Sequence, residues 1–217
     1  MRYLVIVILI FSLFSCTKIG RNVTVKGVVK NPITGKTYEG LKVHLLVGET
    51  FQLPGGYKEI KSTETDQNGR FELSAGRTRE VYVQVFDAAG NYRLGWYEDG
   101  EYKGTSVKKA TKGKTMEVEY HLVPYGEVTL DIQNINCESI EDTMWFRSKT
   151  QFEESYPSNW SFPRVGCYSY TSPSPNTNFI IGNRTYQIRV KRSGVETVTE
   201  ETFFIEENEL MVIQLHY

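Results

Sequence analysis

The stretch TETDQNGRFEL, 63–73, brings Asp66 and Gly69 close together and allows two interpretations. A calcium loop of the EF-hand type needs oxygen ligands at positions 1, 3 and 5, a glycine at 6 and an acid at 12. Counted from Asp66, position 6 is Phe71 and position 12 is Arg77, so the calcium interpretation fails. Asp, Asn and Gly do favour the backbone of tight hairpin turns. The stretch therefore predicts a tight turn between two strands.

Around this turn, apolar and polar residues alternate over short runs, which is typical of strands with one buried face. No window of helical length shows a sustained repeat of 3.6 residues. The strands expected in the first half are 23–29, 41–47, 71–73, 81–86, 92–97 and 116–123. This pattern predicts an all-β domain, a sandwich of the Greek-key type.

The pattern starts again after the turn PYG at 124–126. The strands expected here are 127–135, 144–148, 165–171, 178–182, 184–192, 198–206 and 210–217, and the aromatic and proline-rich stretch 152–163 reads as a long loop. We therefore predict two tandem β-sandwiches, over 23–124 and 125–217. A single larger sandwich is the alternative, because 116–135 could run almost continuously through the turn.

Three segments of the first domain, VKGVVKNPITGKTYEGLKVHLL, STETDQNGRFEL and VYVQVF, resemble the carboxypeptidase regulatory-like domain of exported proteins in Bacteroidetes-type bacteria. The matching residues, in order, are Gly27, Gly35, Gly40, Val43, Thr65, Asp66, Gly69 and Phe71. The resemblance covers roughly 23–86 and implies a transthyretin-like sandwich. It also implies a role as a spacer, folding partner or extension, with no catalytic residues to carry over.

The N-terminus has the form of an export signal. Arg2 precedes an apolar run that ends at Phe14, well short of the roughly 20 residues that span a membrane. LFSC, ending at Cys16, resembles the lipobox of bacterial lipoproteins, which implies a signal peptide over 1–15, lipid on the Cys16 thiol and a tether over 16–22. An ordinary secretory signal with an incidental cysteine is the alternative. The tether carries no acidic residue, which favours the periplasmic face of the outer membrane over the cell surface.

Cys137 and Cys167 are the two remaining cysteines. An even pair in an exported chain predicts a disulfide. The loop it closes would be worth roughly 3 to 4 kcal/mol in the chain-entropy model. Two free, buried thiols are the alternative.

Aromatic residues in expected loops and strand ends are candidates for ligand binding, because exposed rings stack on sugar faces and occur at protein interfaces. These candidates are Trp96, Tyr97, Tyr102, Tyr156 and Trp160. Core packing is the competing interpretation for all of them. In addition, DTM at 142–144 resembles the acceptor of the O-glycosylation system in such bacteria, which makes Thr143 a candidate for a sugar.

Other chemistry finds little support. The three histidines, His44, His121 and His216, fall on the polar faces of expected strands, and none has a metal-ligand spacing. Neither a nucleophile-elbow motif nor a zinc-protease motif occurs. The formal net charge of −1, spread along the chain, does not suggest nucleic-acid binding.

The sequence favours a non-enzymatic, lipid-anchored cell-envelope protein that acts as a binding or scaffolding module, without cofactor or metal. Its expected partners are the membrane, through the lipid, and an envelope protein or a glycan. The alternatives are a carbohydrate-binding lipoprotein of a glycan-uptake system and a fimbrial or adhesin-type subunit. The fimbrial alternative would need a removable strand or an intramolecular Lys–Asn bond.

Overall fold

The computed structural model describes residues 22–48, 56–76 and 80–217, so the expected signal peptide and Cys16 lie outside the described residues. Within them, every regular element is a β-strand. The same residues contain no helix with the length and apolar character needed to cross a membrane. The chain divides into unit 1, up to Leu122, and unit 2, from Val123, each with its own apolar core. The all-β prediction of two sandwiches in tandem is confirmed.

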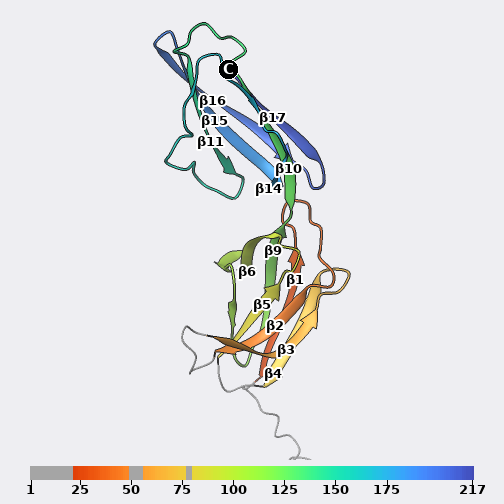
Figure 1. Ribbon diagram of the computed structural model, residues 1–217. Coiled ribbons are helices and arrows are strands. Elements are labelled where there is room, and N and C mark those ends of the chain that lie inside the picture. The colour runs from red at the N-terminus through yellow and green to blue at the C-terminus, as the bar shows by residue number, and fades with distance from the viewer. Residues whose placement is uncertain (1–21, 49–55, 77–79) are drawn as a thin grey trace, which may run out of the picture. The chain divides into compact units, whose positions relative to one another are not determined.

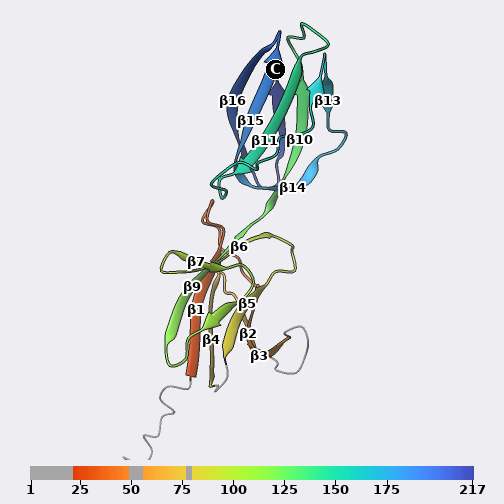
Figure 2. The same ribbon diagram turned by 90° about the vertical axis from the view of Figure 1, so that its left-hand side faces the viewer.

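Unit 1 consists of two sheets that lie as separate layers (Figures 1 and 2). One has the strand order β4-β1-β9-β6-β7 and the other β3-β2-β5-β8. The strands are β1 (Asn22–Lys30), β2 (Lys42–Gly48), β3 (Tyr57–Glu64), β4 (Arg70–Gly76), β5 (Val81–Phe86), β6 (Tyr92–Glu98), β7 (Glu101–Gly104), β8 (Lys108–Ala110) and β9 (Thr115–Val123). The expected alternation places Val23, Val25, Val43, Leu45, Met116, Val118, Tyr120 and Leu122 in the core.

The stretch 63–73 does form a turn. Asp66 Oδ1 accepts the N–H groups of Asn68 and Arg70, both at 2.8 Å, and Gly69 has the left-handed φ of 68°. The turn joins two strands, as predicted, but it does not form a hairpin, because β3 and β4 belong to different sheets. Thr65 fixes the crossing: its hydroxyl donates to the Tyr38 carbonyl at 2.6 Å. The turn therefore carries the chain from one layer to the other.

Gly27 is explained by its neighbour across β1 and β4. It lies opposite Phe71, and a Cβ at this position would come within 2.6 Å of both the Phe71 ring and the Val118 carbonyl oxygen. Only glycine leaves room for the ring over the strand.

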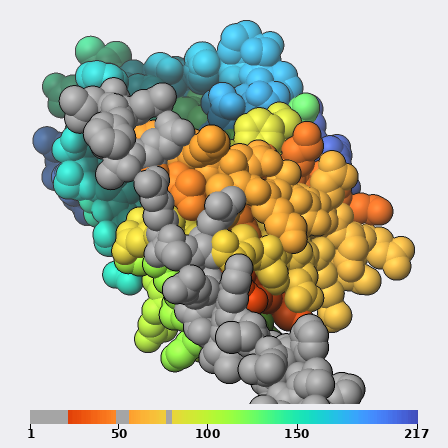
Figure 3. Space-filling view, turned by 90° about the horizontal axis from the view of Figure 1, so that it is seen from below, coloured from red at the N-terminus to blue at the C-terminus, as the bar shows by residue number. Residues whose placement is uncertain are grey.

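The expected strands of unit 1 did not include β3. Its eight residues, YKEIKSTE, are almost all exposed, because β3 is an edge strand that pairs only with β2. In the space-filling view, the orange and gold surface of this region of unit 1 is open to solvent (Figure 3). With only Ile60 and Thr63 half-buried, the strand shows no alternation in its sequence.

Unit 2 also has two layers, which are clearest in Figure 2. One sheet has the order β12-β11-β15-β16, and in the other β10 pairs with β13, β14 and β17. The strands are β10 (Tyr125–Gln133), β11 (Thr143–Thr150), β12 (Arg164–Val165), β13 (Ser169–Thr171), β14 (Asn176–Ile180), β15 (Gly182–Arg192), β16 (Val195–Ile205) and β17 (Leu210–His216). The core contains Val128, Ile132, Met144, Tyr186, Ile188, Ile205, Ile213 and Leu215.

Both units are closed in the same way. The first and last strands of unit 1, β1 and β9, pair in parallel, and so do the first and last strands of unit 2, β10 and β17 (Figure 1). Each sandwich therefore joins its own ends, which supports the division into two folded bodies.

Candidate functional site

A cavity of about 780 Å³ lies on the outer face of the five-stranded sheet of unit 1, and we call it the unit 1 cavity. Its floor consists of two rows across β4, β1 and β9. One row is Glu72, Lys26 and Glu117, and the other is Arg70, Val28 and Glu119. These residues point outward because they alternate with the buried residues of the same strands.

Some charges on and beside this floor are already paired. Lys26 lies 3.0 Å from Glu72, and Lys30 lies 2.8 Å from Glu119. The Lys30 ammonium, and after it His121, holds the pKa of the Glu119 carboxyl below its usual value. Within the described residues, the side chains of Arg70 and Glu117 have no hydrogen bond or ion pair to another residue. They are therefore available to a ligand.

One of the predicted aromatic residues, Tyr97, lines this cavity, and a second, Tyr102, contacts Tyr97. The Tyr97 ring lines it and stacks on the His121 ring, with centroids 4.2 Å apart and an interplanar angle of 24°. Tyr102 meets the edge of Tyr97 at 5.7 Å and is about half exposed, at 53%. The stacking fixes the orientation of the Tyr97 ring.

Trp96 lies in the core of unit 1, so the prediction that it binds a ligand at the surface is wrong. Its exposed fraction is 0%, and its ring packs 4.6 Å from Tyr120 and 6.3 Å from Phe71 in the core of unit 1. It points inward because it alternates with Tyr97 on β6. Core packing, the competing interpretation, holds for this residue.

In unit 2, a stack of alternating rings and cations covers the outer face of the sheet that contains β11 and β15. The Arg189 guanidinium lies 4.4 Å from the Trp145 ring and 4.7 Å from the Trp160 ring. Arg147 lies 4.4 Å from Trp160 and 5.3 Å from Tyr156. Lys149 continues the series at 4.9 Å from Tyr156. We call this arrangement the cation–π stack; such contacts are worth about 0.5–1 kcal/mol each at exposed sites.

The expected long loop 152–163 supplies two rings of the stack and is held against β11. The Ser161 N–H donates to the Phe146 carbonyl at 2.8 Å, and the Phe146 N–H donates to Ser161 Oγ at 3.0 Å. Arg147 Nη1 donates to the Pro157 carbonyl at 3.0 Å. Tyr156 and Trp160 are therefore both half-buried and already in contact with cations of their own chain. Stacking of a sugar on Trp160 would have to compete with these contacts.

The edge strand β16 pairs with β15 on one side, and the described residues place no strand on its other side. Its first eight residues are exposed on both faces. Val195 and Val198 are apolar side chains in this exposed set, at 64% and 51%, and Phe204 near the end of β16 is exposed at 44%. Leu210 and Val212 of β17 are similarly exposed. An unpaired edge with exposed apolar side chains is a template for pairing with another strand.

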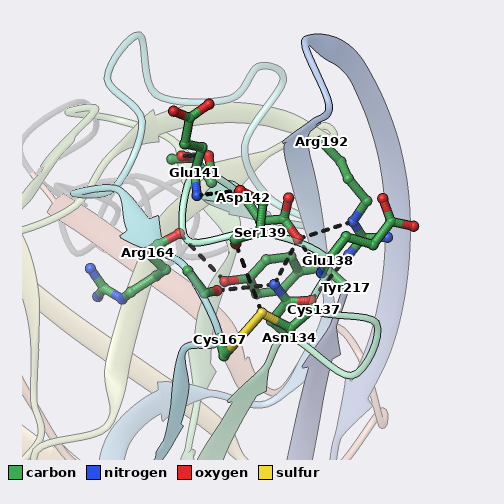
Figure 4. Close-up of polar contacts among 12 residues, drawn as sticks. Asn134, Cys137, Glu138, Ser139, Glu141, Asp142, Arg164, Cys167, Arg192 and Tyr217 are labelled. Atoms are coloured by element: carbon green, nitrogen blue, oxygen red, sulfur yellow. Dashed lines mark hydrogen bonds and ion pairs between the residues drawn. A yellow bond between two sulfur atoms is a disulfide. The ribbon is translucent and has the colours of Figure 1, made fainter.

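The disulfide between Cys137 and Cys167 is present, with Cα atoms 5.1 Å apart. Beside it, Asp142 is fully buried and its Oδ2 accepts hydrogen bonds from Glu138 N–H at 3.0 Å and from Asn134 at 3.3 Å (Figure 4). Arg192 Nε lies 3.4 Å from the same oxygen. The Glu138 N–H is the main reason that the pKa of the Asp142 carboxyl lies below its usual value.

Thr143, the candidate for a sugar, follows Asp142 directly. It lies on β11 between β12 and β15, where it pairs with Val165 and Lys191. The residue is half-buried, and its hydroxyl donates an exposed hydrogen bond to the Glu141 carbonyl at 2.8 Å.

Each of the three histidines, expected on the polar faces of strands, contacts a carboxylate. His44 lies 2.6 Å from Glu59, and His216 lies 3.0 Å from Asp131. His121 lies 2.9 Å from Glu119. In the part of the chain that the structure describes, no cluster of three or more metal-ligating side chains occurs.

No protein-family model matches the chain, and no curated protein matches it by sequence. Among solved structures, it is similar to GBS52, the minor pilin of Streptococcus agalactiae, at 11% identity and a TM-score of 0.36, covering 89% of this chain and 95% of that chain. It is also similar to the shaft pilin SpaA of Lactobacillus rhamnosus GG, at 10% identity and a TM-score of 0.31, covering 91% and 97%. A leucine-rich repeat protein of Bacteroides thetaiotaomicron shows 12% identity and a TM-score of 0.24, covering 90% of this chain and 27% of that chain.

Sequence reasoning missed most of the unit 1 cavity. Arg70, Glu72 and Glu117 are polar residues on the solvent faces of strands, where such residues are ordinary. Their proximity follows from the pairing of β1 with both β4 and β9, which separate segments of the sequence do not reveal. The cation–π stack had a partial signal, the aromatic residues of 152–163, but its cations come from β11 and β15.

Proposed function

We propose that this protein is a non-enzymatic, lipid-anchored module of the bacterial cell envelope that binds or scaffolds another envelope protein. Unit 1 serves as the carboxypeptidase regulatory-like spacer, and unit 2 presents the surface for the partner. The lipid on Cys16 holds the protein at the periplasmic face of the outer membrane. Multiple acyl chains of this kind give stable anchoring, where a single chain gives only marginal binding.

The observation that carries the proposal is the edge strand β16. Val198 and Phe204 are six residues apart, so they lie on the same face of the strand. Both are about half exposed. Backbone groups on the free side of an edge strand are unpaired, so an added strand gains main-chain hydrogen bonds as well as apolar contacts. Strand addition to an exposed edge is an established mode of protein recognition.

The charge of this region supports a partner other than a second copy of the same strand. The segment from Val195 to Tyr217 contains six glutamates and no lysine or arginine. Three of the glutamates, Glu196, Glu200 and Glu201, lie on β16 itself. Two such strands placed side by side would bring like charges together, which is destabilising.

The test is a pull-down from envelopes of the native host with the tagged, lipidated full chain. We expect one defined protein partner, and we expect its capture to be lost in Val198→Asp and Phe204→Asp. Ile140→Asp is the matched control, because Ile140 is an apolar residue of unit 2 that is 83% exposed and lies outside β16. Capture that is equal in all three variants would refute the role of β16.

Placement in the envelope has its own tests. Intact mass of the protein from the native host should show the loss of 1–15 and the addition of lipid at Cys16. Protease treatment of whole cells should leave the protein intact, whereas release of the folded units would contradict the periplasmic placement.

The fimbrial alternative can be separated by its chemistry. The closing strands hold apolar residues at their inward positions, such as Val25 and Val118 in unit 1 and Ile132 and Leu215 in unit 2. Lys26 and Lys30 of β1 face outward and pair with glutamates. The closing strands therefore place no lysine inside these cores that could form an intramolecular Lys–Asn bond. We expect no loss of ammonia in the intact mass.

A further inference from the structure

The unit 1 cavity has the rigidity and size of a ligand site. Its floor is built on three strands, β4, β1 and β9, which are paired along seven consecutive positions on each side of β1. Between the two floor rows lie Phe71 and Val118, which belong to the core of unit 1. Its volume of about 780 Å³ falls within the range of small-molecule sites, about 300–1,000 Å³.

The floor combines an apolar centre with polar groups on both sides. Val28 lies between Arg70 and Glu119 in one row, and Lys26 lies between Glu72 and Glu117 in the next. Arg70 and Lys26 donate hydrogen bonds, whereas the carboxylates accept them. A ligand that rests on Val28 is therefore surrounded by donors and acceptors at the same time.

One side of the cavity is closed by an aromatic ring and a tight turn. Tyr97 is held by its stacking on His121, and Asp99 and Gly100 follow in the turn between β6 and β7. Asp99 has a φ of 52°, as expected in a sharp turn, and it lines the cavity. A fixed ring beside polar groups gives a ligand one flat apolar surface and several polar contacts.

The charges decide the class of ligand. Asp66, Glu72, Asp99, Glu117 and Glu119 line the cavity, against the two bases Lys26 and Arg70. This surplus of acids repels phosphates, sulfates and carboxylates. Because Lys26 is paired with Glu72 and Glu119 with Lys30, the groups that remain available include one donor, Arg70, and one acceptor, Glu117. Vicinal hydroxyl groups can accept from the former and donate to the latter.

From this combination we propose that the unit 1 cavity binds a neutral oligosaccharide. A sugar ring has C–H faces that fit Val28 and Tyr97 and a rim of hydroxyl groups that fit Arg70 and Glu117. The site lies entirely within unit 1 and is independent of the protein partner proposed for β16. The protein would then hold a glycan with one unit and a protein with the other.

The experiment uses the full chain, purified in a detergent without a sugar headgroup and labelled with a fluorophore, on an array of neutral, acidic and amino-sugar oligosaccharides. We expect binding to neutral oligosaccharides. Tyr97→Leu, which keeps apolar volume but removes the ring, and Glu117→Ala should each weaken titrated binding at least about tenfold, which corresponds to about 1.4 kcal/mol. Tyr170→Ala is the matched control, a tyrosine of unit 2 that is 43% exposed, and it should bind as the unaltered chain does.

Thermal melts of all variants confirm that they are folded. Glu117→Ala provides a second route if Tyr97→Leu destabilises unit 1, because the Glu117 side chain has no partner in the described residues. Absence of any neutral ligand on the array would overturn the proposal. So would binding confined to glycans with free amino groups, or neutral binding that both variants leave unchanged.

Discussion

Unit 1 and unit 2 close their sandwiches in the same way but stabilise them differently. In each, the first strand pairs in parallel with the last, β1 with β9 and β10 with β17. Unit 1 fills the space between its sheets with large apolar side chains, including the fully buried Trp96. Unit 2 has a smaller apolar cluster.

Unit 2 supplements its core with other interactions. The Cys137–Cys167 disulfide and the buried Asp142 lie at one place in its structure, and the cation–π stack covers one of its sheets. One closing topology is therefore compatible with stabilisation by burial or by covalent and polar contacts. Conditions that weaken one kind of contact should therefore lower the free energy of unfolding of one unit more than that of the other.

The largest expected effect is that of Trp96→Ala, which removes a large, fully buried side chain from unit 1. We expect a loss of about 3–5 kcal/mol in the free energy of unfolding of unit 1. Trp145 and Trp160, the two other tryptophans of the chain, lie in unit 2 and report on that unit. Guanidinium titration should show an early transition by far-UV circular dichroism and an unshifted transition by tryptophan fluorescence.

A fluorescence transition that moves together with the circular dichroism would contradict this comparison. It would mean that the two units unfold as one cooperative body. Trp96→Phe serves as the control, since it keeps an aromatic ring in the same place and should shift the first transition less.

The next effect concerns the disulfide. Replacing both Cys137 and Cys167 by Ser should destabilise unit 2 by roughly 3 to 4 kcal/mol, because the bond closes a loop with a sequence separation of 30. In a Trp96→Phe background, tryptophan fluorescence reports only on unit 2. The unfolding transition seen by fluorescence should therefore move to a lower denaturant concentration. If reduction of the unaltered chain instead shifts the transition of unit 1, the assignment of the bond to unit 2 stability is wrong.

The sequence predicted the strands with a buried face well but missed the exposed edge strand β3. In β9, Met116, Val118, Tyr120 and Leu122 alternate with polar residues, so the inward face is visible in the sequence. In the edge strand β3 only Ile60 and Thr63 are half-buried, so its sequence shows no alternation. The turn at 63–73 was predicted, but its passage between the two sheets depends on the pairing of β4 with β1, which is a long-range contact.

The candidate site was predicted only in part, for a related reason. Tyr97 was identified by its residue type, whereas its neighbour Trp96 was identified by the same criterion and is buried. Neighbours on a strand point to opposite faces, so the assignment depends on which face of β6 meets the core. The polar floor of the cavity comes from three strands that are distant in sequence, and charged residues on a strand have the same appearance whether or not they line a cavity.

A smaller effect is expected for Trp160→Ala in unit 2. The ring contacts Arg147 and Arg189, and two exposed cation–π contacts together are worth about 1–2 kcal/mol. In a Trp96→Phe background, the remaining fluorescence comes from Trp145 and should show a modestly earlier transition for unit 2, while unit 1 keeps its stability. A loss as large as that of Trp96→Ala would show that Trp160 is a core residue and not part of a surface stack.

The smallest effect is limited to acidic solution and concerns Asp142. The pKa of this carboxyl is lowered in the folded protein from an ordinary value of 3.8, chiefly by the Glu138 N–H. A carboxyl with a lowered pKa stabilises the fold fully above the unfolded value, and this contribution is lost as the pH falls from about 3.8 through the lower, folded value. Unit 2 should therefore lose stability in this window.

Asp142→Asn tests this assignment, because an amide has no carboxyl to protonate. The variant should be less stable than the unaltered chain at neutral pH, since Arg192 then lacks its acidic partner. Below about pH 4, the melting temperatures of the two proteins should converge. Asp131 of unit 2, whose pKa His216 lowers, keeps its own acid dependence in both proteins, so the convergence isolates Asp142. If the difference in melting temperature between the two proteins stays the same over the whole pH range, the Asp142 charge does not stabilise the structure around the disulfide.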